Sequence, residues 1–119
     1  MSDVNEYIKR PLLYVAGPYA HPDCVLNTHN TIKAAEKALE LGYTPVIPHL
    51  SMFWHAVVPH EIDFWYRYDL ALLIKCDILV RLPGESSGSD KEVELAIEHG
   101  ITVFIGMEKL PDVKEWYRG

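Results

Sequence analysis

The chain has 119 residues, 49% of them hydrophobic and 24% charged, which suits one folded core and argues against disorder. Eleven basic and 17 acidic side chains give a formal net charge of −6, so we expect no binding to a nucleic-acid polymer, whose phosphates require a basic surface. A small anion held by backbone N–H groups stays possible, because it needs no net positive charge. We expect residues 1–119 to form a single domain.

The two cysteines, Cys24 and Cys76, lack CxxC spacing, which favours reduced intracellular thiols over a disulfide framework. The first residues contain neither a basic stretch nor an apolar stretch, so we expect no signal peptide. The longest wholly aliphatic run, 70–74, is far shorter than the roughly 20 residues that a membrane-spanning helix needs. These features predict a cytoplasmic protein with no membrane partner.

Short apolar runs alternate with amphipathic segments along the chain. The expected order is strand 12–16, helix 27–41, strand 44–47, loop or broken helix 48–60, helix 61–75, strand 77–81, helix 89–99, strand 101–105 and short helix 110–117. Gly42 and Gly100 are expected to end the first and third of these helices. The alternation predicts a small open α/β sheet, mostly parallel, with helices on both faces in a Rossmann-like arrangement.

Ligands of such sheets bind beyond the carboxyl ends of the strands. Three segments of this chain are expected to lie at that edge: 17–21 after the first strand, residue 48 onward after the second, and 82–90 after the third. We expect any functional site to be built from these three segments.

The segment Ser86-Ser87-Gly88-Ser89-Asp90-Lys91-Glu92 joins the third strand to the third helix. Free N–H groups and the positive end of a helix dipole make such a segment a natural anion site. Ser89 and Glu92 also fit the S-x-x-E capping box, whose role is only to satisfy the first amides of a helix. Spacing alone favours the cap and leaves the anion site open. Neither a Walker loop nor a G-x-G-x-x-G motif is present.

Asp69 lies close to the apolar stripe of the 61–75 helix, either at the edge of that stripe or near a cleft. His49, His55, His60, Glu61 and Asp63 are close in sequence, but they lack H-E-x-x-H spacing, so we expect no metal and no cofactor. Aromatic side chains of the same region are candidates for stacking on a flat ligand, or for core or subunit contacts. They are Phe53, Trp54, Trp65, Tyr66 and Tyr68.

Three segments together resemble the nucleoside 2-deoxyribosyltransferase superfamily, which also contains nucleotide N-glycosidases that hydrolyse the base–sugar bond. They are Tyr14-Val15-Ala16-Gly17-Pro18-Tyr19, then Asp69-Leu70 followed eight residues later by Asp77, and then Ser87-Gly88-Ser89-Asp90-Lys91-Glu92-Val93-Glu94-Leu95-Ala96. The resemblance covers residues 14 to about 106. It implies a deoxyribosyltransferase-like fold and a homo-oligomer, dimer or larger, because the family completes its site with a neighbouring subunit.

The resemblance also implies three catalytic roles. Glu92 corresponds to the family's nucleophile on the anomeric carbon, Tyr14 to the tyrosine that holds it, and Asp69 to the acid that handles the leaving base. Retaining glycosyl transfer needs such a carboxylate nucleophile and a second acid. We expect the helix N-terminus to keep Glu92 ionised and desolvation to keep a proton on Asp69 near neutral pH. Glu94, turned roughly 200° from Glu92 on the helix, is expected outside the site.

The substrate implied is a small nucleoside or nucleotide. Ser86 stands where monophosphate N-glycosidases of the family carry a phosphate-binding serine, whereas Pro18 and Ala20 replace the serine and arginine that those enzymes also use. The other substrate-binding candidates are Gly17, Tyr19, His49, Trp54, Ser87 and Gly88. The expected function is an N-glycosidase acting on a nucleoside 5′-monophosphate or a nucleoside. The alternatives are a deoxyribosyltransferase, or a non-catalytic nucleotide-binding sensor or subunit in which Glu92 only caps the helix.

Overall fold

The computed structural model describes residues 4–118 and contains a four-stranded, all-parallel sheet in the order β2–β1–β3–β4. The strands are β1 (Leu12–Ala16), β2 (Thr44–Val46), β3 (Ile78–Arg81) and β4 (Thr102–Ile105). The helices are α1 (Val4–Lys9), α2 (Cys24–Glu40), α3 (Ser51–Val57), α4 (Ile62–Leu73), α5 (Ser87–Glu98) and α6 (Val113–Arg118), with 3-10 turns η1 (Pro48–Leu50) and η2 (Met107–Lys109). The predicted Rossmann-like α/β architecture is thereby confirmed.

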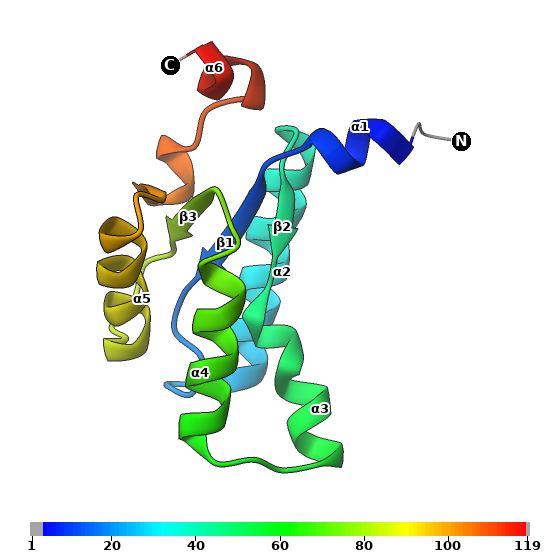
Figure 1. The fold of residues 1–119 in the computed structure, drawn as a ribbon. Helices are drawn as coiled ribbons and strands as arrows, with labels where there is room; N and C mark the ends of the chain where they lie inside the picture. The colour runs from blue at the N-terminus through cyan, green and yellow to red at the C-terminus, as the bar shows by residue number, and fades with distance from the viewer. Residues whose placement is uncertain (1–3, 119) are drawn as a thin grey trace.

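The side chains of β1 alternate between two hydrophobic clusters, one on each face of the sheet. Leu13 and Val15 pack with α2 and the C-terminal segment, whereas Tyr14 and Ala16 pack with α4 and α5. Figure 1 shows α4 and α5 together on one face and α2 on the other. The sheet is therefore covered on both sides, which is what an apolar parallel sheet requires.

The strand order reverses between β1 and β3: the chain adds β2 on one side of β1, and then β3 and β4 on the other side. β1 pairs with β2 on one side and with β3 on the other, and Ala16 at the end of β1 is opposite Arg81 at the end of β3. Crossover connections that leave in opposite directions at such a point open a crevice at the carboxyl edge. The α3–α4 hairpin extends from that edge, at the end of the molecule opposite the two termini (Figure 1).

Two helices begin earlier than the sequence pattern indicated. α2 begins three residues early because the carboxylate of Asp23 accepts hydrogen bonds from the amides of Val25 and Leu26, a cap that lies outside the apolar stripe. α5 begins at Ser87 and not at Ser89. α1 was not predicted, and its apolar residues Val4, Tyr7 and Ile8 are exposed, so this helix contributes nothing to the core. The interrupted segment 48–60 is confirmed as a broken helix, η1 followed by α3.

Cys24 and Cys76 are both free thiols in the structure. Within residues 4–118, no helix combines the length and the apolar composition that crossing a bilayer demands.

Gly42 lies just after α2 and allows the backbone to turn at the end of this helix. Its φ of +103° is one that residues with a Cβ seldom adopt, and a Cβ there would lie 2.3 Å from Cγ1 of Val113. We expect Gly42→Ala to lower the free energy of unfolding by about 1–2 kcal/mol through the backbone alone, and by more through the clash. Urea denaturation measures the total loss of unfolding free energy, which contains the backbone contribution and the clash with Val113. Gly42→Ala/Val113→Gly, compared with Val113→Gly, should retain only the backbone part, because glycine also removes the Val113 Cβ that would lie 3.0 Å from the new Cβ. An unchanged stability of Gly42→Ala would contradict the argument.

Candidate active site

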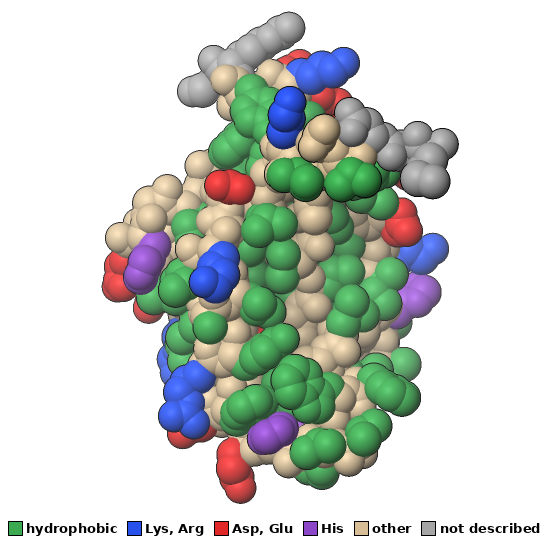
Figure 2. All heavy atoms as spheres, turned by 45° about the vertical axis from the view of Figure 1, so that its right-hand side comes forward, with side chains coloured by type: hydrophobic (Ala, Val, Ile, Leu, Met, Phe, Trp, Pro, Cys, Tyr) green, Lys and Arg blue, Asp and Glu red, His purple; other side chains and the backbone are tan. Residues whose placement is uncertain are grey.

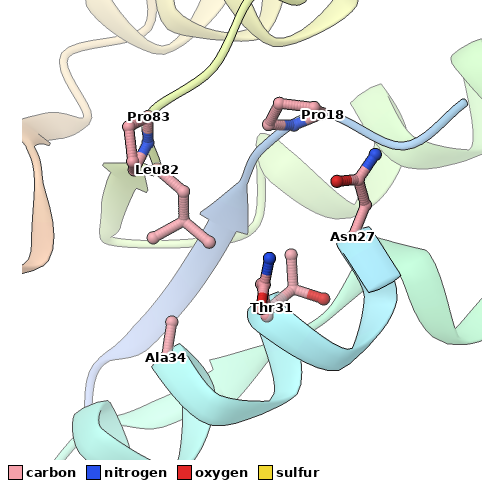
Figure 3. Close-up of a pocket in the computed structure, with 7 residues that line it drawn as sticks. Pro18, Asn27, Thr31, Ala34, Leu82 and Pro83 are labelled. Carbon is pink, nitrogen blue, oxygen red and sulfur yellow. The ribbon is translucent and has the colours of Figure 1, made fainter. Parts of the chain in front are cut away.

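A cleft of about 1560 Å³ opens at the carboxyl edge of β1 and β3. The three segments that follow the strands all contribute to its walls: residues 17–22, residues 48–69 of the η1–α3–α4 region, and residues 83–92. A smaller, adjoining pocket of about 190 Å³, which shares Pro18, Asn27 and Pro83 with the cleft, lies between α2 and the end of β3 (Figure 3). The lining of this smaller pocket has no ionisable side chain.

A buried hydrogen bond forms the floor of this cleft. The hydroxyl of Tyr14, which is completely buried in β1, donates to Oε2 of Glu92. Glu92 faces the sheet because it shares one side of α5 with the buried residues Ser89 and Ala96. It lines the cleft although only 8% of it is exposed. The tyrosine therefore holds the carboxylate from behind, while the carboxylate faces the cleft.

The predicted capping box of Ser89 and Glu92 is wrong. The N-cap of α5 is Ser86, whose backbone is extended and whose Oγ accepts a hydrogen bond from the Ser89 amide at 3.1 Å. Ser86 also donates to the hydroxyl of Ser89 at 3.0 Å. Because the helix begins two residues earlier than expected, Glu92 lies in its second turn, out of reach of the first amides. The cap therefore does not occupy Glu92.

Asp69, from α4, also lines the cleft. Its Oδ1 is buried and has no hydrogen-bond partner among residues 4–118. Burial, and then the neighbouring charge of Glu92, raise the pKa of Asp69 to about 7. The raised pKa agrees with the expectation that desolvation keeps a proton on this acid near neutral pH.

Burial also raises the pKa of Glu92 to about 7, although the hydrogen bond from Tyr14 and the charge of Arg81 both lower it. The expectation that the start of the helix keeps Glu92 ionised is therefore wrong, because the carboxylate lies one turn further into the interior. Burial raises the pKa of Tyr14 as well, so its hydroxyl keeps its proton and remains a donor. Two carboxyl groups that titrate near neutrality thus share one cleft.

The β1–α2 loop forms a second wall and is held in place by His49. Nε2 of this nearly buried histidine donates to the carbonyl of Pro18 at 2.8 Å, and its ring meets Tyr19 edge-on with centroids 5.5 Å apart. Burial lowers the pKa of His49, so the ring stays neutral. At Gly17, a Cβ would come within 3.2 Å of the Leu82 side chain, which explains the glycine at this close approach.

The β3–α5 loop, which contains Ser86, Ser87 and Gly88, forms the third wall. Arg81 fastens this loop by donating to the carbonyls of Leu82 and Gly84 and to the carboxylate of Asp90. No lysine or arginine of the described residues lines the cleft, whereas four acidic residues do, namely Glu61, Asp69, Glu85 and Glu92.

Trp54, a predicted substrate-binding residue, does not line the cleft. Its ring packs edge-on against Trp65 and Tyr68, with centroids 5.1 and 5.4 Å away. The next residue, His55, lines the cleft instead, because successive helical residues point about 100° apart. Glu94 is exposed and outside the cleft, as expected. Within residues 4–118 no group of three or more histidine, cysteine or acidic side chains is arranged to hold a metal ion.

The comparisons with known proteins identify a family without a described activity. A search of the curated proteins finds no match to the chain. Residues 11–105, which include every strand and all of the cleft lining, match the family described as a domain of unknown function, DUF7768. The chain therefore belongs to the DUF7768 family.

Proposed function

We propose that the protein is an N-glycosidase that cleaves the base–sugar bond of a nucleoside or a nucleoside 5′-monophosphate, with Glu92 as the nucleophile. One observation carries the proposal: Tyr14 holds Glu92 at the floor of the cleft, and the same cleft contains the unpartnered oxygen of Asp69. The resemblance to nucleoside 2-deoxyribosyltransferases gives these three residues the corresponding roles.

In the first step, ionised Glu92 attacks the anomeric carbon from one side as the bond to the base breaks. The electron pair of that bond leaves with the base nitrogen, and protonated Asp69 gives its proton to the departing base. Tyr14 keeps one carboxylate oxygen occupied, which leaves Oε1 to form the ester with the sugar. The step needs Glu92 ionised and Asp69 protonated, a state that two groups with a pKa of about 7 populate near neutral pH.

In the second step, water attacks the same carbon, Asp69 takes its proton, and Glu92 is released. A free base that reaches the ester before water gives transfer of the sugar instead of hydrolysis. The cleft is open to solvent, which is consistent with either acceptor.

The alternative from another functional class is a non-catalytic nucleotide-binding protein. This alternative assigns Glu92 only to helix capping, whereas in this structure Ser86 caps the helix. Burying an ionisable group that stabilises no helix end is unfavourable unless it has another role. The structure therefore favours the catalytic interpretation.

The test of the reaction uses base release. Wild-type protein is incubated with the common nucleosides and their 5′-monophosphates, with and without a free acceptor base, and products are followed by chromatography. We expect Glu92→Gln to reduce release by at least about a thousandfold, because its amide cannot form the sugar ester. Glu94→Gln, which alters an exposed acid of the same helix, is the matched control and should keep full activity.

The reactions that contain a free acceptor base distinguish hydrolysis from transfer, because transfer forms a new nucleoside and hydrolysis does not. If wild type releases no base from any substrate and Glu92→Gln binds nucleotides equally well, the binding-only alternative is correct and the proposal fails.

The pH dependence follows from the two carboxyl groups. Below pH 7 Glu92 becomes protonated, and above pH 7 Asp69 loses its proton, so kcat/KM should be bell-shaped with its maximum near neutrality. Tyr14→Phe removes a hydrogen bond that lowers the pKa of Glu92, and should therefore move the acidic limb to higher pH. Tyr43→Phe is the control, because the hydroxyl of Tyr43 bonds the Pro111 carbonyl outside the cleft. A flat profile between pH 5 and 9 would contradict these assignments.

We also propose that the protein is a homo-oligomer. Supporting this, six large apolar side chains in and beside α3 are 42–85% exposed: Leu50, Phe53, Trp54, Val57, Val58 and Ile62. We call them the hairpin patch. Figure 2 shows hydrophobic side chains gathered at that end of the molecule. Ile62 also lines the cleft, so a second copy seated on the patch would lie beside the site.

Light scattering at micromolar concentration tests the assembly. We expect wild type to be a dimer or larger, and Phe53→Asp/Val57→Asp to be a monomer with unchanged far-UV circular dichroism, because two charges oppose burial of the patch. Ile97→Asp, at an exposed apolar residue of α5 outside the patch, should leave the assembly intact. A monomeric wild-type protein would contradict the proposal.

A further inference from the structure

His55 joins the two helices of the α3–α4 hairpin. Its Nδ1 lies 2.7 Å from the indole nitrogen of Trp65 on α4 and 3.2 Å from the backbone nitrogen of His60 in the connecting turn. The His55 and Trp65 rings meet at 73°, with their centroids 5.7 Å apart. These contacts fix both the position and the orientation of the imidazole.

The two contacts also determine where its hydrogen is. An indole N–H and a backbone N–H can only donate, so Nδ1 carries no hydrogen and accepts both bonds. In the neutral ring the hydrogen is then on Nε2. Nε2 has no hydrogen-bond partner among residues 4–118, and it is not among the atoms sealed from solvent. His55 lines the cleft, which thus contains a fixed and unused hydrogen-bond donor.

Trp65, which holds this donor, lies on the same helix as Asp69. Trp65 and Asp69 are four residues apart on one helix, so they lie on the same face about one turn from each other. Both line the cleft. A base whose leaving nitrogen meets Asp69 therefore has Trp65, and the His55 that it holds, about one helical turn away.

From this arrangement we infer that His55 is a substrate-binding residue, whose Nε2–H donates to a ring nitrogen or carbonyl oxygen on the outer edge of the base. Trp65 is its positioning residue. The inference rests on the proposed function, and it adds that the cleft selects planar bases with an acceptor beyond the glycosidic nitrogen. Recognition by a donor discriminates against a base without the acceptor, since that base leaves a desolvated N–H unpaired.

Calorimetry in a Glu92→Gln background measures binding without turnover. The probes are 2′-deoxyadenosine, 2′-deoxyguanosine, 2′-deoxycytidine and thymidine and their 5′-monophosphates, together with analogues of each that lack one acceptor atom of the base. We expect His55→Leu to raise the Kd of the preferred nucleoside about tenfold, the loss typical of one hydrogen bond. His55→Gln, whose amide nitrogen reaches the Nε2 position, should stay within about threefold of the parent, and Trp65→Phe should lie between the two.

The analogues separate a direct contact from a structural effect. In the protein with His55, one analogue should bind about tenfold more weakly than its parent nucleoside. In His55→Leu, the same analogue and its parent should bind equally well, because the variant already lacks the donor that pairs with the missing acceptor. Circular dichroism shows whether His55→Leu folds. If it does not, the same question is answered by the affinities of the analogues for His55→Gln and Trp65→Phe.

Two failures are distinguishable. If the protein with intact Glu92 releases base and His55→Leu neither weakens binding nor alters the response to any analogue, the inference is wrong and the proposed function stands. If neither a nucleoside nor a nucleoside 5′-monophosphate is bound or cleaved by the protein with His55 intact, both fail.

Discussion

The hydrogen bond between Tyr14 and Glu92 is the interaction on which the candidate site depends. A carboxyl group buried to this extent is tolerated only with a partner, and β1 supplies one from beneath the cleft. Because β1 is an interior strand, paired on both sides, the tyrosine hydroxyl is held at a fixed place. The orientation of Glu92 is thereby set by the sheet itself.

The loop before α5 makes that interaction possible. Ser86 satisfies the start of the helix, and Arg81 fixes the loop by bonding two of its carbonyls and Asp90. Glu92 is thus free of the capping role that its spacing suggested. Within the described residues, the cleft lining contains four acidic side chains and no lysine or arginine.

The other half of the site comes from one element. The α3–α4 hairpin provides Asp69, Trp65 and His55, and it faces the Tyr14–Glu92 pair across the cleft. Burial brings the pKa of both carboxyl groups close to 7, so the same desolvation that destabilises their ionised forms also suits them to exchange protons at neutral pH. The exposed apolar side of the hairpin borders this arrangement, so the oligomer that we propose would bring a second copy beside the site.

The sequence by itself determined the α/β class, the four strands and the edge at which the cleft opens, because apolar runs and helical periodicity are local properties of the chain. The resemblance to a known family directed attention to Tyr14, Asp69 and Glu92. Only the tertiary structure decided that Ser86 caps α5, that Glu92 titrates near pH 7, and that His55 and not Trp54 lines the cleft. Each of these depends on which groups meet across the fold or are shielded from water, and the spacing of residues along one chain does not contain that information.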